Sequence, residues 1–313
     1  MRIVSLLPSA TEIVYALGYG EDVVGVSHEC DFPPEVAKVP RMIEPVFENT
    51  QLNSERISAI VIDHLTRGES LYKVRIEELK KADPDLIITQ ELCDVCAVGS
   101  ADVLAAVNQL CKPVSVLSLN PHSLKDVKDD IRSVAKILGA TKNADKLIIE
   151  LEAKVDRIRR LTEESYRPRV FCVEWLKPLM NAGHWVPEMV EYAGGTESLA
   201  SRGQLSRCID WDSVVKYDPE VIILMPCGYM TGKTLDEVKR VFEFNKIEGV
   251  SALHNGKVFA TDGHNYFSRS GPRLFDAVEI LAQLIHPELF PQPLNSQLGT
   301  RVELPTAESV QLR

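Results

Sequence analysis

Two cysteines in a C-x-x-C spacing, Cys93 and Cys96, follow the apolar run "LIIT" that is typical of a buried strand. Thiolates at this spacing can bind a metal ion or form a redox pair. A structural zinc site needs four ligands, and no second C-x-x-C exists, so His28 and Cys30 would have to complete it. Acidic neighbours such as Asp94 disfavour thiolates, which argues against a redox pair. Ligand contact or simple packing of the thiols is the favoured interpretation.

Three histidines stand at comparable places in the chain. His28, His184 and His264 each lie beyond a strand-like apolar stretch. Imidazole is the commonest protein ligand for metals and can also reach a metal inside a bound chelate. Taken singly, each could equally be a hydrogen-bonded loop residue.

Motifs for nucleotide binding and acyl transfer are not met. The segment "GYMTGKT" (228–234) follows a strand-like stretch, but only three residues separate its two glycines, whereas a P-loop needs four. No G-x-S-x-G elbow for a serine nucleophile is present either. The sequence therefore gives no support for a P-loop nucleotide site or a serine nucleophile.

The elements that must position these residues alternate between strand-like and helix-like stretches. This alternation predicts parallel sheets covered by helices on both faces. The strands are expected at 2–7, 22–27, 85–90, 113–118, 169–175, 220–226 and 257–262. Helical periodicity predicts two consecutive helices at 123–139 and 143–164 between the two sets of strands. Ser9, with Glu12 three residues later, matches a capping box at the start of the first helix.

An internal similarity organises the chain. The segment "IEELKKADPDLIITQELC" (76–93) resembles "WDSVVKYDPEVIILMPC" (211–227), each a helix, an Asp-Pro turn and an apolar strand. The fold class predicted is α/β, with two Rossmann-like lobes of parallel sheet joined by a single long helix. The expected parts are an N-terminal lobe at 1–121, a linking helical region at 122–167, a C-terminal lobe at 168–288 and an extended tail at 289–313.

The loops after the strands are where a ligand is expected. In open parallel sheets, ligands bind beyond the carboxyl ends of the strands. If the two lobes face each other, the loops carrying the histidines and the paired cysteines line one cleft.

Bulk composition limits the partners. The net charge is −10 and the pI about 5.3, so nucleic acid is not expected as a partner. No apolar run reaches the ~20 residues needed to cross a bilayer, so no membrane insertion is expected. The seven scattered cysteines do not resemble a secreted disulfide framework, and a cytoplasmic monomer is expected. An exported protein whose leader had been removed would look the same.

Four segments carry a family resemblance. They are "RIVSLLPSATEIVYALGYGEDVVGVSHECDFPPE", "DPDLIIT", "RVFCVEW" and "DGHNYFSRSGPRL". Together they resemble the class III solute-binding proteins of ABC importers for vitamin B12 and iron chelates. The segments "SHECDFP" and "TQELCDVCAV" resemble the cobalamin-binding branch of this family that lacks a signal peptide. The resemblance extends over the chain to about residue 288.

What the resemblance implies is a rigid two-lobe binder for a corrinoid, without catalysis and without a required cofactor. The protein would then act either with an ABC transporter permease or as a cytoplasmic corrinoid carrier. The ligand-binding positions that it implies are Pro8, Ser9, His28, Glu29, Cys30, Cys93, Cys96, Glu174, His184, Trp185, Tyr229, His264, Tyr266, Phe267 and Arg269. Any of the three histidines could bind the cobalt of the corrinoid.

Two alternatives stay open. One is a binder of another metal chelate, such as a siderophore or haem, although the acidic loops are poorly suited to an anionic chelate. The other is an enzyme or metallochaperone that holds a bare metal ion with His28, Cys30, Cys93 and Cys96.

Overall fold

The computed structural model describes residues 1–47, 52–90, 100–247 and 249–303. Its N-terminal lobe is built on a four-stranded sheet, ordered β2-β1-β5-β6, in which all neighbours are parallel. The strands are β1 (Ile3–Ser5), β2 (Val23–Val26), β5 (Leu86–Gln90) and β6 (Ser115–Leu119). The helices of this lobe are α1 (Pro8–Ala16), α3 (Ile76–Ala82) and α4 (Ser100–Val107).

The C-terminal lobe has a five-stranded sheet, ordered β11-β10-β9-β7-β8. Its three central strands are parallel, and the two edge strands run antiparallel to them. The strands are β7 (Val170–Trp175), β8 (Met180–Asn181), β9 (Val221–Leu224), β10 (Val258–Thr261) and β11 (Gly299–Arg301). The helices are α7 (Val186–Tyr192), α8 (Trp211–Tyr217), α9 (Thr231–Val241), α10 (Ser251–His254), α11 (Gly263–Tyr266) and α12 (Arg273–Ile285). The strand β11 lies inside the stretch predicted as an extended tail.

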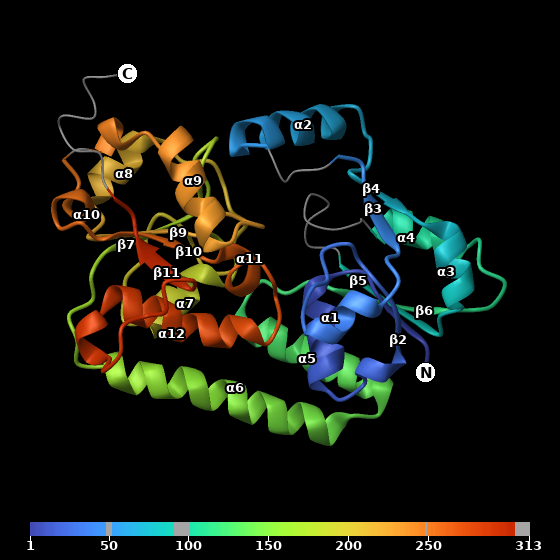
Figure 1. Ribbon diagram of the computed structural model, residues 1–313. Helices are drawn as coiled ribbons and strands as arrows, with labels where there is room; N and C mark the ends of the chain where they lie inside the picture. The colour runs from blue at the N-terminus through green and yellow to red at the C-terminus, as the bar shows by residue number, and fades with distance from the viewer. Residues whose placement is uncertain (48–51, 91–99, 248, 304–313) are drawn as a thin grey trace.

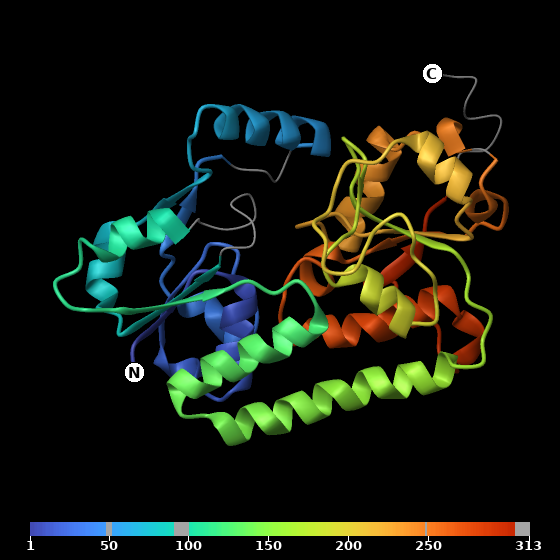
Figure 2. The same cartoon turned by 180° about the vertical axis from the view of Figure 1, so that it is seen from behind.

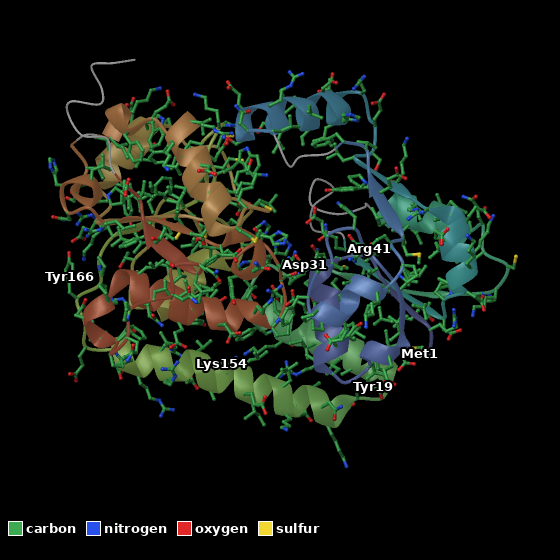
Figure 3. All side chains as sticks on the ribbon, viewed as in Figure 1. Met1, Tyr19, Asp31, Arg41, Lys154 and Tyr166 are labelled. Atoms are coloured by element: carbon green, nitrogen blue, oxygen red, sulfur yellow. The ribbon has the colours of Figure 1, made fainter. Side chains whose placement is uncertain are left out.

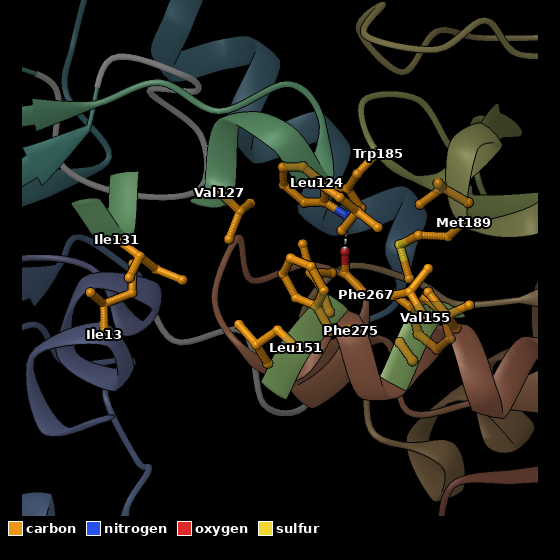
Figure 4. Packing of buried hydrophobic residues seen from close by; sticks show 14 of the residues in the cluster. Ile13, Leu124, Val127, Ile131, Leu151, Val155, Trp185, Met189, Phe267 and Phe275 are labelled. Carbon is orange, nitrogen blue, oxygen red and sulfur yellow. Dashed lines mark hydrogen bonds between the residues drawn. The ribbon is translucent and has the colours of Figure 1, made fainter. Parts of the chain in front are cut away.

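One long helix, α6 (Thr141–Thr162), joins the lobes and is preceded by α5 (Leu124–Leu138). Helix α5 ends at Gly139, whose left-handed φ of 71° suits glycine, and α6 then runs back along both lobes (Figure 1). One buried apolar cluster extends from the first sheet through these helices into the second lobe. Figure 4 shows part of it, where side chains of α5, α6 and α12 meet. The predicted fold class is confirmed, and the shared core fixes one lobe against the other.

The internal similarity is visible in the backbone. Helices α3 and α8 both end at an aspartate in the left-handed conformation, Asp83 (φ 41°) and Asp218 (φ 50°). Both following strands begin with the same hydrogen bond, because Asp85 N–H donates to Arg2 and Glu220 N–H donates to Arg169, each to a carbonyl oxygen at 2.8 Å. The two segments therefore take the same place in their sheets.

The start of α1 differs from the prediction. The helix begins at Pro8, its N-cap is Leu7, and no side chain caps it. Proline suits the first position because its missing N–H would have no partner there. Ser9 lies inside the helix, so the predicted capping box of Ser9 and Glu12 is wrong.

A small antiparallel pair of strands departs from the N-terminal sheet. Strand β3 (Ile43–Pro45) pairs with β4 (Tyr72–Val74), and between them the chain forms helix α2 (Ser54–Thr66). Figures 1 and 2 both show α2 apart from the sheets, above the space between the two lobes. Across the described ranges, no helix has the length and apolar character that a bilayer span requires.

Candidate functional site

Loops from both lobes meet in a cluster of charged side chains. Asp31 follows β2, and His264 and Arg269 follow β10. The Arg269 guanidinium donates to both carboxylate oxygens of Asp31, at 2.5 and 3.1 Å, and His264 Nε2 lies 2.7 Å from Asp31 Oδ2. Arg269 also donates to the carbonyl oxygen of Glu29 at 3.1 Å. Figure 3 labels Asp31 where the two lobes face each other.

Burial makes this cluster stronger than a surface ion pair. Arg269 is only 6% exposed, whereas Asp31 is 49% exposed. Burial alone would raise the pKa of Asp31, but hydrogen bonds from His264 and Arg269 hold it well below its usual range. A bidentate pair fixes both distance and orientation, so the cluster ties the two loops together.

A second ion pair lies beneath the first. Glu12 of α1 accepts hydrogen bonds from Arg273 of α12 at 2.6 and 3.0 Å. Glu12 is 3% exposed and Arg273 13% exposed. A Cβ at Gly271 would lie 3.4 Å from Cα of Ser9, which is van der Waals contact and shows how closely the two segments approach. The segments "PSATE" and "SRSGPR", which carry much of the family resemblance, therefore pack against each other across the lobes.

Aromatic side chains form a third group on the C-terminal lobe. The rings of Trp175 and Tyr229 meet edge to face with centroids 5.5 Å apart, and Lys233 Nζ lies 4.0 Å from the centre of the Tyr229 ring. Burial lowers the pKa of Lys233, while Glu237 and Glu29 raise it. The Tyr229 hydroxyl is buried and has no hydrogen-bond partner among the described residues.

A fourth group surrounds His184, before α7. Its ring stacks on that of His122 at 5.4 Å, and burial, followed by His122, lowers its pKa to about 4. The Nδ1 atoms of both rings are buried without a hydrogen-bond partner in the described part of the chain. The next residue, Trp185, donates from Nε1 to the carbonyl oxygen of Phe267 at 2.9 Å, as Figure 4 shows.

Several predicted ligand positions are placed in structural roles. Trp185 and Phe267 are buried in the core that joins the lobes. Cys30 belongs to the same core, its thiol lies 3.1 Å from the Thr11 hydroxyl, and burial raises its pKa to about 11. A protonated, buried thiol favours the packing role over metal binding.

The remaining predicted positions lie nearer the loops. Glu174 accepts a hydrogen bond from the Ser206 hydroxyl at 2.6 Å, and His28 Nε2 lies 3.4 Å from Glu29. Tyr266 lies under the guanidinium of Arg273 at 5.7 Å. Pro8 and Ser9 begin α1. Cys93 and Cys96 lie outside the described residues. Within the described ranges, no three His, Cys, Asp or Glu side chains gather as a metal site would require.

Other residues of these groups were not predicted as ligand positions. They are Glu12, Asp31, His122, Trp175, Lys233 and Arg273. Trp175 stands at the carboxyl end of β7, so the rule for parallel sheets could have included it. The pairing of Glu12 with Arg273 has no local signal in the sequence.

A cavity of about 680 Å³ opens beside the ion pair of Glu12 and Arg273. It lies between α1 and the first residues of α12, and Tyr15 and Phe32 contribute aromatic walls. The guanidinium of Arg273 lies 4.4 Å from the centre of the Phe32 ring. The cavity therefore adjoins the contact between the lobes and is built from both of them.

Two α/β lobes whose loops face each other and are joined by ion pairs form the two-lobe architecture of a solute-binding protein. The chain matches the family described as Periplasmic binding protein over residues 3–264, and it belongs to that family.

Three similar proteins extend this finding. The chain is 27% identical over 300 residues to the uncharacterized ABC transporter substrate-binding lipoprotein YvrC of Bacillus subtilis, covering 92% of this chain and 81% of that protein. It is 25% identical over 280 residues to the vitamin B12-binding protein of Vibrio cholerae, covering 89% and 86%. A periplasmic haem-binding protein from Pseudomonas aeruginosa shares the fold, with a TM-score of 0.71, 18% identity and coverage of 98% and 99%.

Proposed function

We propose that the protein binds a corrinoid of the cobalamin type between its two lobes. The observation that carries the proposal is the contact of Asp31 with both His264 and Arg269, because it brings strand-end loops of both lobes to one place. A ligand held there touches side chains of both lobes at once. The similarity to a protein named for vitamin B12 supports this ligand class.

The charges around the loops favour a neutral ring over an anionic chelate. The charge of Arg269 is neutralised by Asp31, and the charge of Lys233 is partly balanced by the carboxylates of Glu237 and Glu29. Little positive charge is therefore left for carboxylates of a siderophore or haem. A corrin presents broad apolar faces and an edge of amides, and aromatic side chains such as Trp175 suit such faces.

Buried polar atoms suit the amides at the ring edge. Tyr229 Oη and the Nδ1 atoms of His122 and His184 have no hydrogen-bond partner in the described part of the chain. Such atoms are costly unless a ligand or water satisfies them. An amide-edged ligand supplies both donors and acceptors.

The direct test is calorimetric titration with cyanocobalamin, dicyanocobinamide, haemin and a ferric siderophore. We expect the two corrinoids to bind. Trp175→Leu and Tyr229→Leu should each weaken corrinoid binding about tenfold, while Trp211→Phe, whose ring packs on Phe242, serves as the control. Failure of both corrinoids would end the proposal.

Binding of cobalt by a histidine is a separate part of the proposal, with His28, His184 and His264 as candidates. His264 is engaged by Asp31 and Arg269, so its ring would have to leave them. The absorption spectrum of bound aquocobalamin should change when the ligating histidine becomes alanine. Spectra unchanged in all three variants would remove cobalt ligation while leaving corrinoid binding intact.

Binding of haem or another iron chelate is the second candidate, supported by the shared fold with a haem-binding protein. Tight haemin binding with no corrinoid binding would select it. A bare metal site is checked by elemental analysis of the purified protein.

The cellular setting also belongs to the proposal. We propose a monomer that acts either with an ABC permease or as a cytoplasmic corrinoid carrier. Light scattering after size-exclusion chromatography tests the monomer, and cell fractionation separates the two settings.

A further inference from the structure

Helix α2 is poorly supported by the lobe that carries it. Only Ser54 and Ile57 of its 13 residues are buried. It is attached through β3 and β4, which have three residues each, and a short two-stranded pair is weakly stable by itself. A helix of this length is also marginal in water. Its position must therefore depend on contacts elsewhere.

The C-terminal lobe supplies those contacts at the first turn of α2. The carboxylate of Glu237, on α9, accepts a hydrogen bond from the backbone N–H of Ser54 at 2.5 Å. Ser54 is the first residue of α2, where backbone N–H groups lack partners within the helix and the helix dipole favours a negative charge. Glu237 is 3% exposed, so the contact is shielded from water. A carboxylate of the C-terminal lobe thus accepts a hydrogen bond from an N–H group at the start of a helix in the N-terminal lobe.

A second contact lies one turn further along α2. The indole Nε1 of Trp175 donates to the Ser58 hydroxyl at 2.8 Å, and Ser58 donates to the carbonyl oxygen of Lys177 at 3.1 Å. Trp175 packs on Tyr229, so this turn of α2 rests on the aromatic group described above. The more shielded face of the rest of the helix carries the apolar Ile57, Ile60 and Val61, with His64 one turn further on.

We propose that α2 is a lid over the inter-lobe ligand site, latched to the C-terminal lobe by Glu237 and by the Trp175–Ser58 hydrogen bond. Glu237 and Ser58 are positioning residues that set where α2 lies. Release of the latch uncovers Trp175 and Tyr229 and lets a ligand enter or leave. The identity of that ligand rests on the proposed function, whereas the latch belongs to the ligand-free protein.

Hydrogen–deuterium exchange of the ligand-free protein tests the latch. Glu237→Gln removes the charge and keeps the shape, and it should raise the exchange rate of the α2 amides at least about fivefold. Ser58→Ala should raise the exchange rate of the same amides by a smaller factor. Asp236→Asn, an exposed carboxyl on the same helix, is the matched control and should leave α2 unchanged. If Glu237→Gln also raises exchange in β9 and β10, it has destabilised the whole C-terminal lobe. Ser58→Ala is then the variant that tests the latch. Exchange of α2 at the wild-type rate in both variants would overturn the latch.

Stopped-flow mixing with cyanocobalamin tests the role as a lid. Glu237→Gln should speed association and dissociation together, by about fivefold or more, and leave Kd within about threefold. Faster α2 exchange with wild-type ligand rates would show that α2 does not gate the site. If the wild type binds no cyanocobalamin, the proposed function fails, and α2 exchange alone then decides the latch.

Discussion

Arg269 and Asp31 form a bidentate ion pair that joins the two lobes, with N–O distances of 2.5 and 3.1 Å. The Arg269 side chain is buried, whereas the Asp31 side chain is half exposed. The pair therefore combines the geometry of a strong contact with partial access to water. That access limits its contribution to stability and makes it responsive to pH.

Asp31→Asn should destabilise the protein by about 1–2 kcal/mol at pH 7, because the buried Arg269 loses its bidentate carboxylate and keeps the longer contact with Glu12 at 3.7 Å. The difference from wild type should shrink below about pH 4. There the carboxylate is protonated in the unfolded chain and, as pH falls further through its lowered pKa, in the folded protein too.

Urea unfolding at pH 7 and pH 3 measures this effect. Glu35→Gln, an exposed carboxyl a few residues further along the chain, is the control. Arg269→Lys should restore little of the contact, since an ammonium cannot make both hydrogen bonds. A loss below about 0.5 kcal/mol in Asp31→Asn would contradict the proposed importance of the pair.

The pair of Glu12 and Arg273 is more deeply buried and should matter more. Glu12→Gln should cost about 2–4 kcal/mol, because Arg273 would stay buried without a charge partner. Adding Arg273→Met removes the stranded charge, so the double variant should be more stable than Glu12→Gln alone.

A double-mutant cycle by urea unfolding tests this, with the exposed Glu21→Gln as control. Additive losses in the two single variants would show that the pair contributes no coupling energy.

Glu12 also illustrates the limit of sequence reasoning. Its spacing from Ser9 matched a local helix-capping pattern, and nothing nearby indicated an arginine 261 positions away. A local sequence pattern predicts contacts between residues that are close in the chain, whereas Glu12 forms a contact between the lobes. The order of strands and helices could be predicted from hydrophobic periodicity, because the periodicity of a segment depends only on that segment's own residues. The same reason explains why the latch between Glu237 and Ser54 had no signal in the sequence.

His184 should give the protein a specific dependence on pH. Its pKa of about 4 in the fold lies below the ordinary value of 6.5, so the unfolded chain takes up a proton first as pH falls. This contribution is therefore complete above pH 6.5 and is lost between pH 6.5 and 4. The shift corresponds to ~3 kcal/mol, which partial exposure of the ring reduces to about 1–2 kcal/mol.

His184→Asn removes this titration and keeps a residue that tolerates the positive φ of 50° found here. Between pH 6.5 and 4.5 the variant should lose less stability than wild type. The exposed His254→Asn should follow the wild-type curve. Parallel curves for all three proteins in thermal unfolding would contradict the assignment.

The repeated turns at Asp83 and Asp218 show what sequence similarity could and could not predict. Both were expected to be turns, and both take the left-handed conformation at a helix end. Their side chains differ. Asp218 accepts hydrogen bonds from the Ser251 N–H and hydroxyl at 2.7 and 2.8 Å and from Arg169 at 3.0 Å. The Asp83 side chain makes an exposed contact with Lys112, at 3.2 Å.

Replacement by glycine should therefore act in opposite directions at the two turns. Glycine adopts the left-handed conformation without steric cost, so Asp83→Gly should be neutral or stabilising by up to about 1 kcal/mol. Asp218→Gly gains the same backbone relief but strands the Ser251 N–H, and it should destabilise by about 1–3 kcal/mol. The two midpoints of urea unfolding give the comparison directly, each variant serving as control for the other. Equal shifts would mean that the Asp218 side chain contributes nothing beyond its backbone conformation.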